Sequence, residues 1–355
     1  MNNYDFYYPI RFRNKTKNFD NLFNSWKSVE NTLGSAYKKD EVIDKYFGKD
    51  LDMDTRMSKY FSVLSYRNFE EKGSNIFHFT KELLQLLEQT DVSDIQIKNI
   101  KFPFNSFYIS VRELNRPFTS DKDDDAIIDG IFIEFKDDNE HDLMHDYHIG
   151  FYLCGYSESK KELEFKRTNL DLLELTSELS FESSESTITD AIEVVHQILK
   201  DTTESETTTK EYKEKEINFQ LEDYKRLKDN LNLIINCIIY ISSDKPDIEK
   251  EYRAGIPSHL NDRIKKSNTN RKKEVLEQEL TKFGYTKINL IGKSYKRIAS
   301  ESSLTTINPH WRRGHWRNQP FGTELKESKL IWIKPTIVNK DKGEIGKGHI
   351  YGVKN

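Results

Sequence analysis

Residues 127–135 read IIDGIFIEF, a short run of β-branched and aromatic residues that is typical of a β-strand. Similar runs occur on both sides of it, at residues 95–100, 106–111, 147–154 and 162–166. Turn-forming and charged segments, such as NRPFTSDKDDD at residues 115–125, separate these runs. The pattern predicts a central antiparallel sheet that packs against helices on one face.

Helical spacing of apolar residues dominates outside this region. It is clearest in FHFTKELLQLLEQ at residues 77–89 and weaker over residues 18–46. Residues 221–242 contain the apolar run LNLIINCIIYI and predict a buried helix that ends before Pro246. A further helix is expected at residues 191–199, between polar segments rich in Ser, Thr and Glu. The predicted fold class is therefore α+β.

These patterns divide the chain into four expected segments. Residues 1–94 should be mainly helical, and residues 95–259 should form the sheet and its helices as an acidic body. Residues 260–283 are expected to be a basic, polar linker or helix. Residues 284–355 are expected to form a small basic β-rich module, with strands at residues 287–298, 330–338 and 349–353.

The formal net charge of −4 conceals a strong asymmetry. Residues 284–355 contain 14 Lys and Arg against 5 Asp and Glu, a net charge of +9, so the remaining 283 residues carry −13. A basic module attached to an acidic body predicts one of two arrangements. Either the module meets a polyanion, or it docks on its own body.

Composition indicates a folded protein of a reducing compartment. The chain has 355 residues, 12% of them aromatic, which is enough to bury a sizeable core. Its two cysteines form no CxxC pair. The N-terminal MNNYDFYYPIRF lacks the features of a signal peptide, and the apolar run at residues 231–241 is too short to span a bilayer. We therefore expect a cytoplasmic protein without a membrane partner.

The most unusual stretch is NPHWRRGHWRNQPFG, residues 308–322. The candidate site residues gathered around Gly314 are His310, Trp311, Arg312, Arg313, His315, Trp316 and Arg317. If a turn at Gly314 brings the two histidines together, one can act as a base and the other as an acid on an RNA 2′-hydroxyl and its leaving oxygen. The arginines would then hold phosphates and the tryptophans stack on bases, with Lys347 and Tyr351 adding to the site.

A structural interpretation competes with this one. The tryptophans could instead pack the small β-module, while the arginines pair with the acidic body. Because no cysteine lies near the two histidines, a zinc site is not expected there. A second histidine cluster, EHDLMHDYH at residues 140–148, is interpreted as an exposed polar connection. The sequence contains no nucleotide-binding loop and no serine-hydrolase elbow, so no metal and no cofactor are expected.

Residues 309–322, PHWRRGHWRNQPFG, and LIWIKPTIVN at residues 330–339 resemble the C-terminal signature of the second-described family of type V-A anti-CRISPR proteins, with its relatives in phages and mobile elements. The matching positions are Pro309, His310, Arg312, Arg313, Gly314, His315, Trp316, Gly322, Trp332 and Pro335. Weaker matches at residues 102–111, 128–135, 245–248, 255–258 and 288–298 extend the resemblance over roughly residues 95–355. Arg317 departs from the pattern, which can have histidine there.

This resemblance implies recognition of a nascent or exposed peptide, in the family the N-terminal segment of the type V-A effector nuclease. Production of that target would then fall through loss of its message during translation. The implied partners are the peptide and RNA or the ribosome, with RNA cut either by the chain itself or by a recruited host nuclease. Two alternatives stay open: a non-enzymatic inhibitor that binds a folded protein, and a metal-independent ribonuclease toxin that uses His310 and His315.

Overall fold

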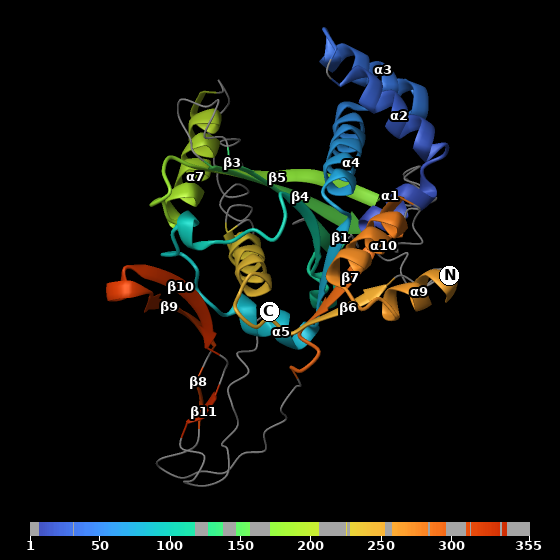
Figure 1. The fold of residues 1–355 in the computed structure, drawn as a ribbon. Helices are drawn as coiled ribbons and strands as arrows, with labels where there is room; N and C mark the ends of the chain where they lie inside the picture. The colour runs from blue at the N-terminus through green and yellow to red at the C-terminus, as the bar shows by residue number, and fades with distance from the viewer. Residues whose placement is uncertain are drawn as a thin grey trace.

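A seven-stranded mixed sheet organises the molecule (Figure 1). The computed structural model describes residues 7–30, 32–117, 127–137, 147–156, 171–205, 225, 228–252, 258–282, 285–295, 310–312, 314–333 and 336–338. The strands of the sheet are β1 (Asn75–Phe79), β2 (Ser106–Ser110), β3 (Ile127–Asp137), β4 (Tyr147–Tyr156), β5 (Asp171–Phe181), β6 (Ile248–Tyr252) and β7 (Lys287–Ile291). They lie side by side in the order β5-β4-β3-β2-β1-β7-β6.

Strand direction divides the sheet into two parts. Neighbouring strands from β2 to β5 are antiparallel, as the sequence predicts, whereas β1 runs parallel to both β2 and β7. Parallel neighbours need a crossover connection of about a dozen residues or more, and the one between β1 and β2 contains α5 (Lys81–Glu88). The α+β prediction is therefore confirmed, with a mixed sheet in place of a wholly antiparallel one.

Four N-terminal helices cover one face of the sheet. They are α1 (Tyr8–Lys15), α2 (Phe19–Val29), α3 (Ser35–Phe47) and α4 (Met53–Glu71). Trp26 of α2 and Phe69 of α4 belong to one buried cluster with Phe132 of β3. Arg11 of α1 reaches the same side of the sheet and forms a buried ion pair of 2.8 Å with Asp129 of β3.

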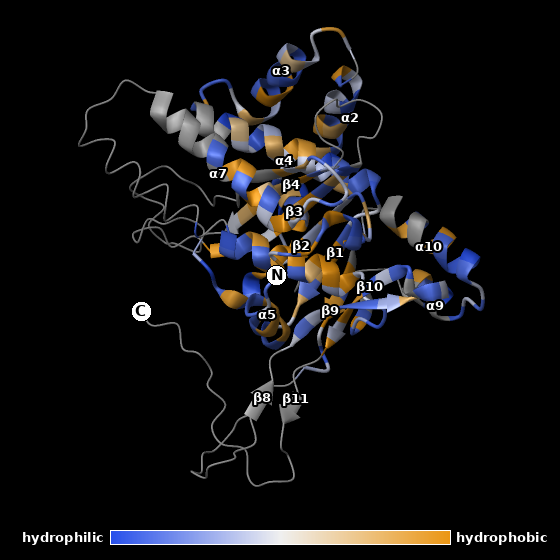
Figure 2. Ribbon diagram, turned by 90° about the vertical axis from the view of Figure 1, so that its left-hand side faces the viewer, coloured by the Kyte–Doolittle hydropathy of each residue, from blue (hydrophilic) through white to orange (hydrophobic). Residues whose placement is uncertain are grey.

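The opposite face is covered by α5, by α7 (Ile188–Ser205) and by a helix of residues 228–241. Phe107 and Ile109 of β2 belong to this second cluster, whereas Tyr108 between them belongs to the first. Because successive strand residues point to opposite faces, both sides of β2 are buried. Helices thus cover both faces rather than the one face expected. Figure 2 shows the hydrophobic residues gathered around the central strands.

Two short apolar segments differ from their predicted structure. Residues 77–89 were predicted as one helix, but they contain the end of β1 and then α5, which begins at Lys81. Residues 95–100 were predicted as a strand, but they contain the 3-10 helix η1 (Ile97–Asn99) and a β-bridge from Gln96 to Thr187. Short apolar runs of this kind do not distinguish a strand from a helix by periodicity alone.

Residues 260–283, expected as a linker or helix, are largely helical, with α9 (Ser258–Lys265) and α10 (Asn270–Lys282). Residues 284–355 supply β7, which lies between β1 and β6. Segments that the sequence separates are therefore neighbours in one sheet, and the four-segment division stays a prediction. The predicted strands at residues 162–166 and 349–353 lie outside the described residues.

The described C-terminal residues form two short ladders. Their elements are β8 (His310–Arg312), β9 (His315–Phe321), η3 (Thr323–Leu325), β10 (Glu327–Ile333) and β11 (Thr336–Val338). β9 pairs with β10 and β8 pairs with β11, both in antiparallel fashion.

Across the described part of the chain, helices long and apolar enough to cross a membrane are absent. The remaining short element is η2 (Arg112–Leu114).

Candidate functional site

The unusual stretch around Gly314 lies on a single interrupted hairpin. In the ladder between β9 and β10, His315 pairs with Ile333, and in the ladder between β8 and β11, Arg312 pairs with Thr336. The second pair lies three residues further along each strand, so both ladders share one register. Between the two ladders, Gly314 is described outside any strand, and residues 313, 334 and 335 lie outside the described residues.

Two tryptophans attach this hairpin to the body. Trp316 and Trp332 pair across β9 and β10, and their ring centroids are 4.9 Å apart. Both rings pack against the core cluster that contains the helix of residues 228–241. The indole N–H of Trp316 donates a 2.7 Å hydrogen bond to Oδ1 of Asn236, and that of Trp332 donates a 3.1 Å bond to the hydroxyl of Tyr295. The indole N–H groups of both tryptophans thus attach the hairpin to the body.

Asn236 connects three separate parts of the chain. It is fully buried in the helix of residues 228–241. Its Nδ2 donates to the carbonyl oxygen of Thr90, at 2.8 Å, and to that of Asn232, at 2.9 Å. Thr90 follows α5, and its hydroxyl donates a 3.4 Å hydrogen bond to the carbonyl oxygen of the buried Gly314. The signature glycine is therefore fixed against the body by the same network.

Two tyrosines complete the anchor on the other side of Trp332. The hydroxyl groups of Tyr240 and Tyr295 are 3.4 Å apart, and the Tyr240 and Trp332 ring centroids are 6.4 Å apart in an edge-to-face arrangement. The Tyr240 hydroxyl also accepts a 3.2 Å hydrogen bond from the backbone N–H of Asp247. Burial raises the pKa of Tyr240 well above its usual value, so its hydroxyl stays protonated near neutral pH.

The face of the hairpin away from this anchor carries two of the predicted site residues. On β9, His315 is half-buried and Arg317 is exposed, and they alternate with Trp316. Ile333 and Ile331 lie opposite them on β10. Among the described residues Arg317 forms no ion pair, so its guanidinium is available to a partner. Half-buried apolar residues beside a free guanidinium form a surface that suits phosphate or an acidic peptide.

The basic hairpin also touches the acidic body. Nζ of Lys329, on β10, lies 2.5 Å from a carboxylate oxygen of Asp244, just after the helix of residues 228–241. The hydrogen bond from Lys329 lowers the pKa of Asp244 below its ordinary value. This contact fits the expectation that the module docks on its own body. Both side chains are substantially exposed, so the pair contributes little to stability.

The other predicted site residues are described only in part. His310, Trp311 and Arg312 form β8, and only the backbone of these residues is described. Arg313, Lys347 and Tyr351 lie outside the described residues. His310 lies in the ladder between β8 and β11, and His315 lies in the ladder between β9 and β10. The described strands therefore place the two histidines in different ladders.

Sequence reasoning did not identify the buried anchor or a second surface feature. Asn232 and Asn236 interrupt the predicted buried helix four residues apart, a spacing that places both on one helical face. That spacing was the available signal for a polar contact inside the core. The tyrosine at position 295 carried no comparable signal.

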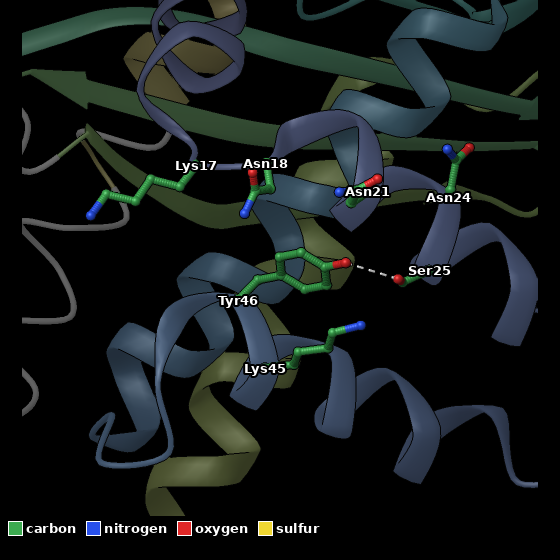
Figure 3. A pocket seen from close by; sticks show the side chains of 7 residues that line it. All are labelled: Lys17, Asn18, Asn21, Asn24, Ser25, Lys45 and Tyr46. Carbon is green, nitrogen blue, oxygen red and sulfur yellow. Dashed lines mark hydrogen bonds between the residues drawn. The ribbon is translucent and has the colours of Figure 1, made fainter.

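The second feature is a polar hollow between α2 and α3, shown in Figure 3, with a volume of about 580 Å³. Its lining residues are Lys17, Asn18, Asn21, Asn24, Ser25, Lys45 and Tyr46. The hydroxyl groups of Tyr46 and Ser25 are hydrogen-bonded at 3.0 Å. Asparagine amides and lysines can bind peptide groups and carboxylates. Asn21 and Asn24, spaced three apart on α2, are the sequence signal for such a face, and Asn18 lies just before the helix.

The histidine cluster of residues 140–148 is described only at its end. His148 lies on β4, and its Nδ1 is 3.1 Å from the hydroxyl oxygen of Ser180 on β5. Residues 138–146 lie outside the described residues. The described residues contain no group of three or more His, Cys, Asp or Glu side chains that could hold a metal ion.

Comparison with known proteins identifies one family. The model of the anti-CRISPR type V subtype A2 family matches residues 77–340, which include the hairpin and most of the sheet. The polar hollow lies outside the matched residues. A crystal structure of AcrVA2 is similar at 14% sequence identity and a TM-score of 0.45, covering 93% of this chain and 97% of that one. No curated protein matches the sequence significantly.

Proposed function

The chain belongs to the anti-CRISPR type V subtype A2 family, and on this basis we propose that it lowers production of a target protein by recognising the target's nascent or exposed N-terminal peptide. Recognition leads to loss of the message during translation. The target class that the family's name suggests is the type V-A effector nuclease. The protein acts in the bacterial cytoplasm on behalf of a phage or another mobile element.

Family membership is the observation that carries this proposal, because the match spans residues 77–340 and includes the C-terminal signature. The geometry of the signature supports a division of roles within it. The Trp316 side chain fixes the hairpin through Asn236, and the neighbouring Arg317 is exposed on β9. Arg317, with His315 beside it, is therefore the best described candidate for contact with RNA or the ribosome.

Message loss is assigned to a recruited host nuclease rather than to this chain. Acid–base cleavage of RNA needs two proton-transferring groups within hydrogen-bond reach of the same phosphodiester. The described strands place the two histidines in different ladders, His310 opposite Val338 and His315 opposite Ile333. This arrangement favours a binding role for the hairpin.

A reporter experiment tests the proposal directly. The N-terminal coding segment of a type V-A effector nuclease is fused to a fluorescent protein, and message and fluorescence are measured with and without this chain. A matched reporter carries a compensated frameshift, so that the RNA is nearly unchanged but the encoded peptide is different. We expect message loss only with the in-frame peptide. Equal loss with both reporters would contradict peptide recognition.

Variants of the chain separate the proposal from its alternatives. Arg317→Glu should abolish message loss while peptide binding in vitro persists, and Lys72→Glu, an exposed charge reversal after α4, is the control. If the message level stays constant but nuclease activity falls, the chain is an inhibitor of the folded protein. If purified chain cleaves single-stranded RNA in EDTA and His315→Ala does not, it is a metal-independent ribonuclease.

A further inference from the structure

The helix pair α9 and α10 forms a small unit with its own apolar contacts. Leu260 and Ile264 of α9 pack against Leu276 and Leu280 of α10, with Tyr285 at the edge of the cluster. Figure 1 shows the pair beside β6 and β7, on the far side of the molecule from β9 and β10. Its outer surface is therefore separate from the signature hairpin.

The first helix of the pair and the start of the second are strongly basic. Residues 258–273 contain six Lys and Arg and one Asp, a net charge of +5, whereas residues 274–282 add three Glu and one Lys. The cations whose side chains are described as exposed are Arg263, Lys266, Arg271, Lys272 and Lys273. We call these five residues the helix-pair patch. In the described part of the chain only Arg263 of this set forms an ion pair, with Glu279 at 3.9 Å.

Folding stability does not explain where these charges lie. Arg271, Lys272 and Lys273 occupy the first turn of α10, which contains no acidic residue. The positive end of the helix dipole is at this terminus, so each exposed cation there costs up to about 1 kcal/mol. The hydroxyl of Thr269 caps the helix by accepting a 3.4 Å hydrogen bond from the N–H of Lys272. A positive terminus lined with further cations is unfavourable unless an anion offsets it.

We propose that the helix-pair patch binds the phosphate backbone of RNA. This inference rests on the proposed function, which places the chain beside a translating ribosome, where RNA is the abundant polyanion. The exposed large hydrophobic residue of the pair is Val275, and the patch itself has no aromatic ring on which bases could stack. Binding therefore uses charge and is independent of sequence, as expected for structured RNA.

Binding of the full-length chain to a fluorescent RNA hairpin of arbitrary sequence, measured by anisotropy over a series of KCl concentrations, tests this inference. The wild type should show a salt slope of roughly −3, because three or four phosphates are neutralised. The variant Arg271→Glu/Lys272→Glu/Lys273→Glu should bind at least about tenfold more weakly. The control Lys72→Glu should bind like the wild type. Glutamates favour a helix N-terminus, so the triple variant should keep α10 folded, which circular dichroism can verify.

Two results would overturn the inference: undiminished RNA binding by the folded triple variant, or equally tight binding of the wild type to polyglutamate, which would assign the patch to acidic polypeptides. The reporter experiment is scored separately. If the wild type causes no message loss, the proposed function fails, while the anisotropy comparison still decides whether the patch binds RNA. Loss of both RNA binding and message loss in the triple variant supports the two together.

Discussion

Trp316 on β9 and Asn236 in the helix of residues 228–241 are joined by a 2.7 Å hydrogen bond from the indole N–H to the amide oxygen. Asn236 is fully buried, and its amide nitrogen donates to Thr90 and Asn232 at the same time. One side chain thus links the family signature to two segments of the body. This hydrogen bond fits the interpretation that Trp316 has a packing role. The alternating residues His315 and Arg317 are then left for contact with partners.

Asn236→Ala should therefore destabilise the protein and loosen the hairpin. The substitution leaves the part-buried Trp316 N–H without its partner, which costs about 1–3 kcal/mol, and also opens a small cavity at the buried Asn236. We expect the free energy of unfolding, measured by urea denaturation, to fall by roughly 2–4 kcal/mol. Trp316→Phe keeps an aromatic ring but removes the donor, so combining it with Asn236→Ala should cost less than the sum of the two single changes. If the losses in the free energy of unfolding from the two single changes were strictly additive, Trp316 and Asn236 would not be energetically coupled.

The buried ion pair between Arg11 and Asp129 supports a prediction about pH. Arg11 and Asp129 side chains are 4% and 0% exposed, and burial raises the pKa of Asp129 while Arg11 opposes that rise. Arg11→Met leaves the carboxylate buried without this partner, which should lower the free energy of unfolding by about 3–5 kcal/mol near neutral pH. The pKa of Asp129 should rise further in the variant.

The sign of the pH effect follows from that rise. A carboxyl whose pKa is higher in the folded state than in the unfolded state binds its proton more tightly in the folded state. The free energy of unfolding therefore falls as pH rises from the unfolded pKa through the folded pKa. The deficit of Arg11→Met relative to wild type should therefore be smaller at pH 5 than at pH 8. Arg56→Met, which removes a partly exposed partner of Asp44, is the control and should cost about 1 kcal/mol or less with little pH dependence. A deficit independent of pH would count against a buried charge at Asp129.

The strands were predictable where runs of β-branched and aromatic residues are bounded by turn-forming segments. The runs at residues 106–111 and 127–135 become β2 and β3 because both faces of these strands are buried by apolar residues. β1 was missed, since Asn75–Phe79 leads directly into α5 and the combined apolar pattern resembles one helix. Its parallel pairing with β7 joins residues more than two hundred positions apart, and no local pattern encodes such a contact.

The residue types of the candidate site were predictable from the sequence, but the directions in which their side chains point were not. The cluster of Trp, Arg and His residues marks the hairpin, yet only the register between β9 and β10 shows that Trp316 faces the core while Arg317 does not. The partner of Trp316 is an asparagine eighty residues earlier, in a helix that reads as apolar. Such a contact depends on how β9 and the helix pack, which is a property of the tertiary fold.

Gly130, in the quoted run of β3, should tolerate no side chain. A Cβ atom there would lie 2.4 Å from the carbonyl oxygen of Ile109 and equally close to the Tyr108 ring, in the middle of the sheet. Gly130→Ala should lower the free energy of unfolding by about 3 kcal/mol or prevent folding, because the backbone of β2 must move. Gly150→Ala on β4 meets mainly the Tyr152 ring, at 3.3 Å, and should cost about 1 kcal/mol or less. Similar urea midpoints for the two variants would show that β2 can yield at this point.

Both cysteine thiols should be unreactive in the folded protein. Cys154 on β4 and Cys237 in the helix of residues 228–241 are fully buried, and burial raises the pKa of the Cys237 thiol well above its ordinary value. The thiolate is the reactive form, so neither access nor ionisation favours modification. Ellman's reagent should therefore detect almost no thiol in the native chain and both thiols in urea, since the chain contains only two cysteines. Asn236→Ala offers a sensitive comparison, because this substitution beside Cys237 in the same helix should speed labelling at that residue and leave Cys154 protected. Fast labelling of both thiols in the wild type would contradict the two buried clusters that enclose them.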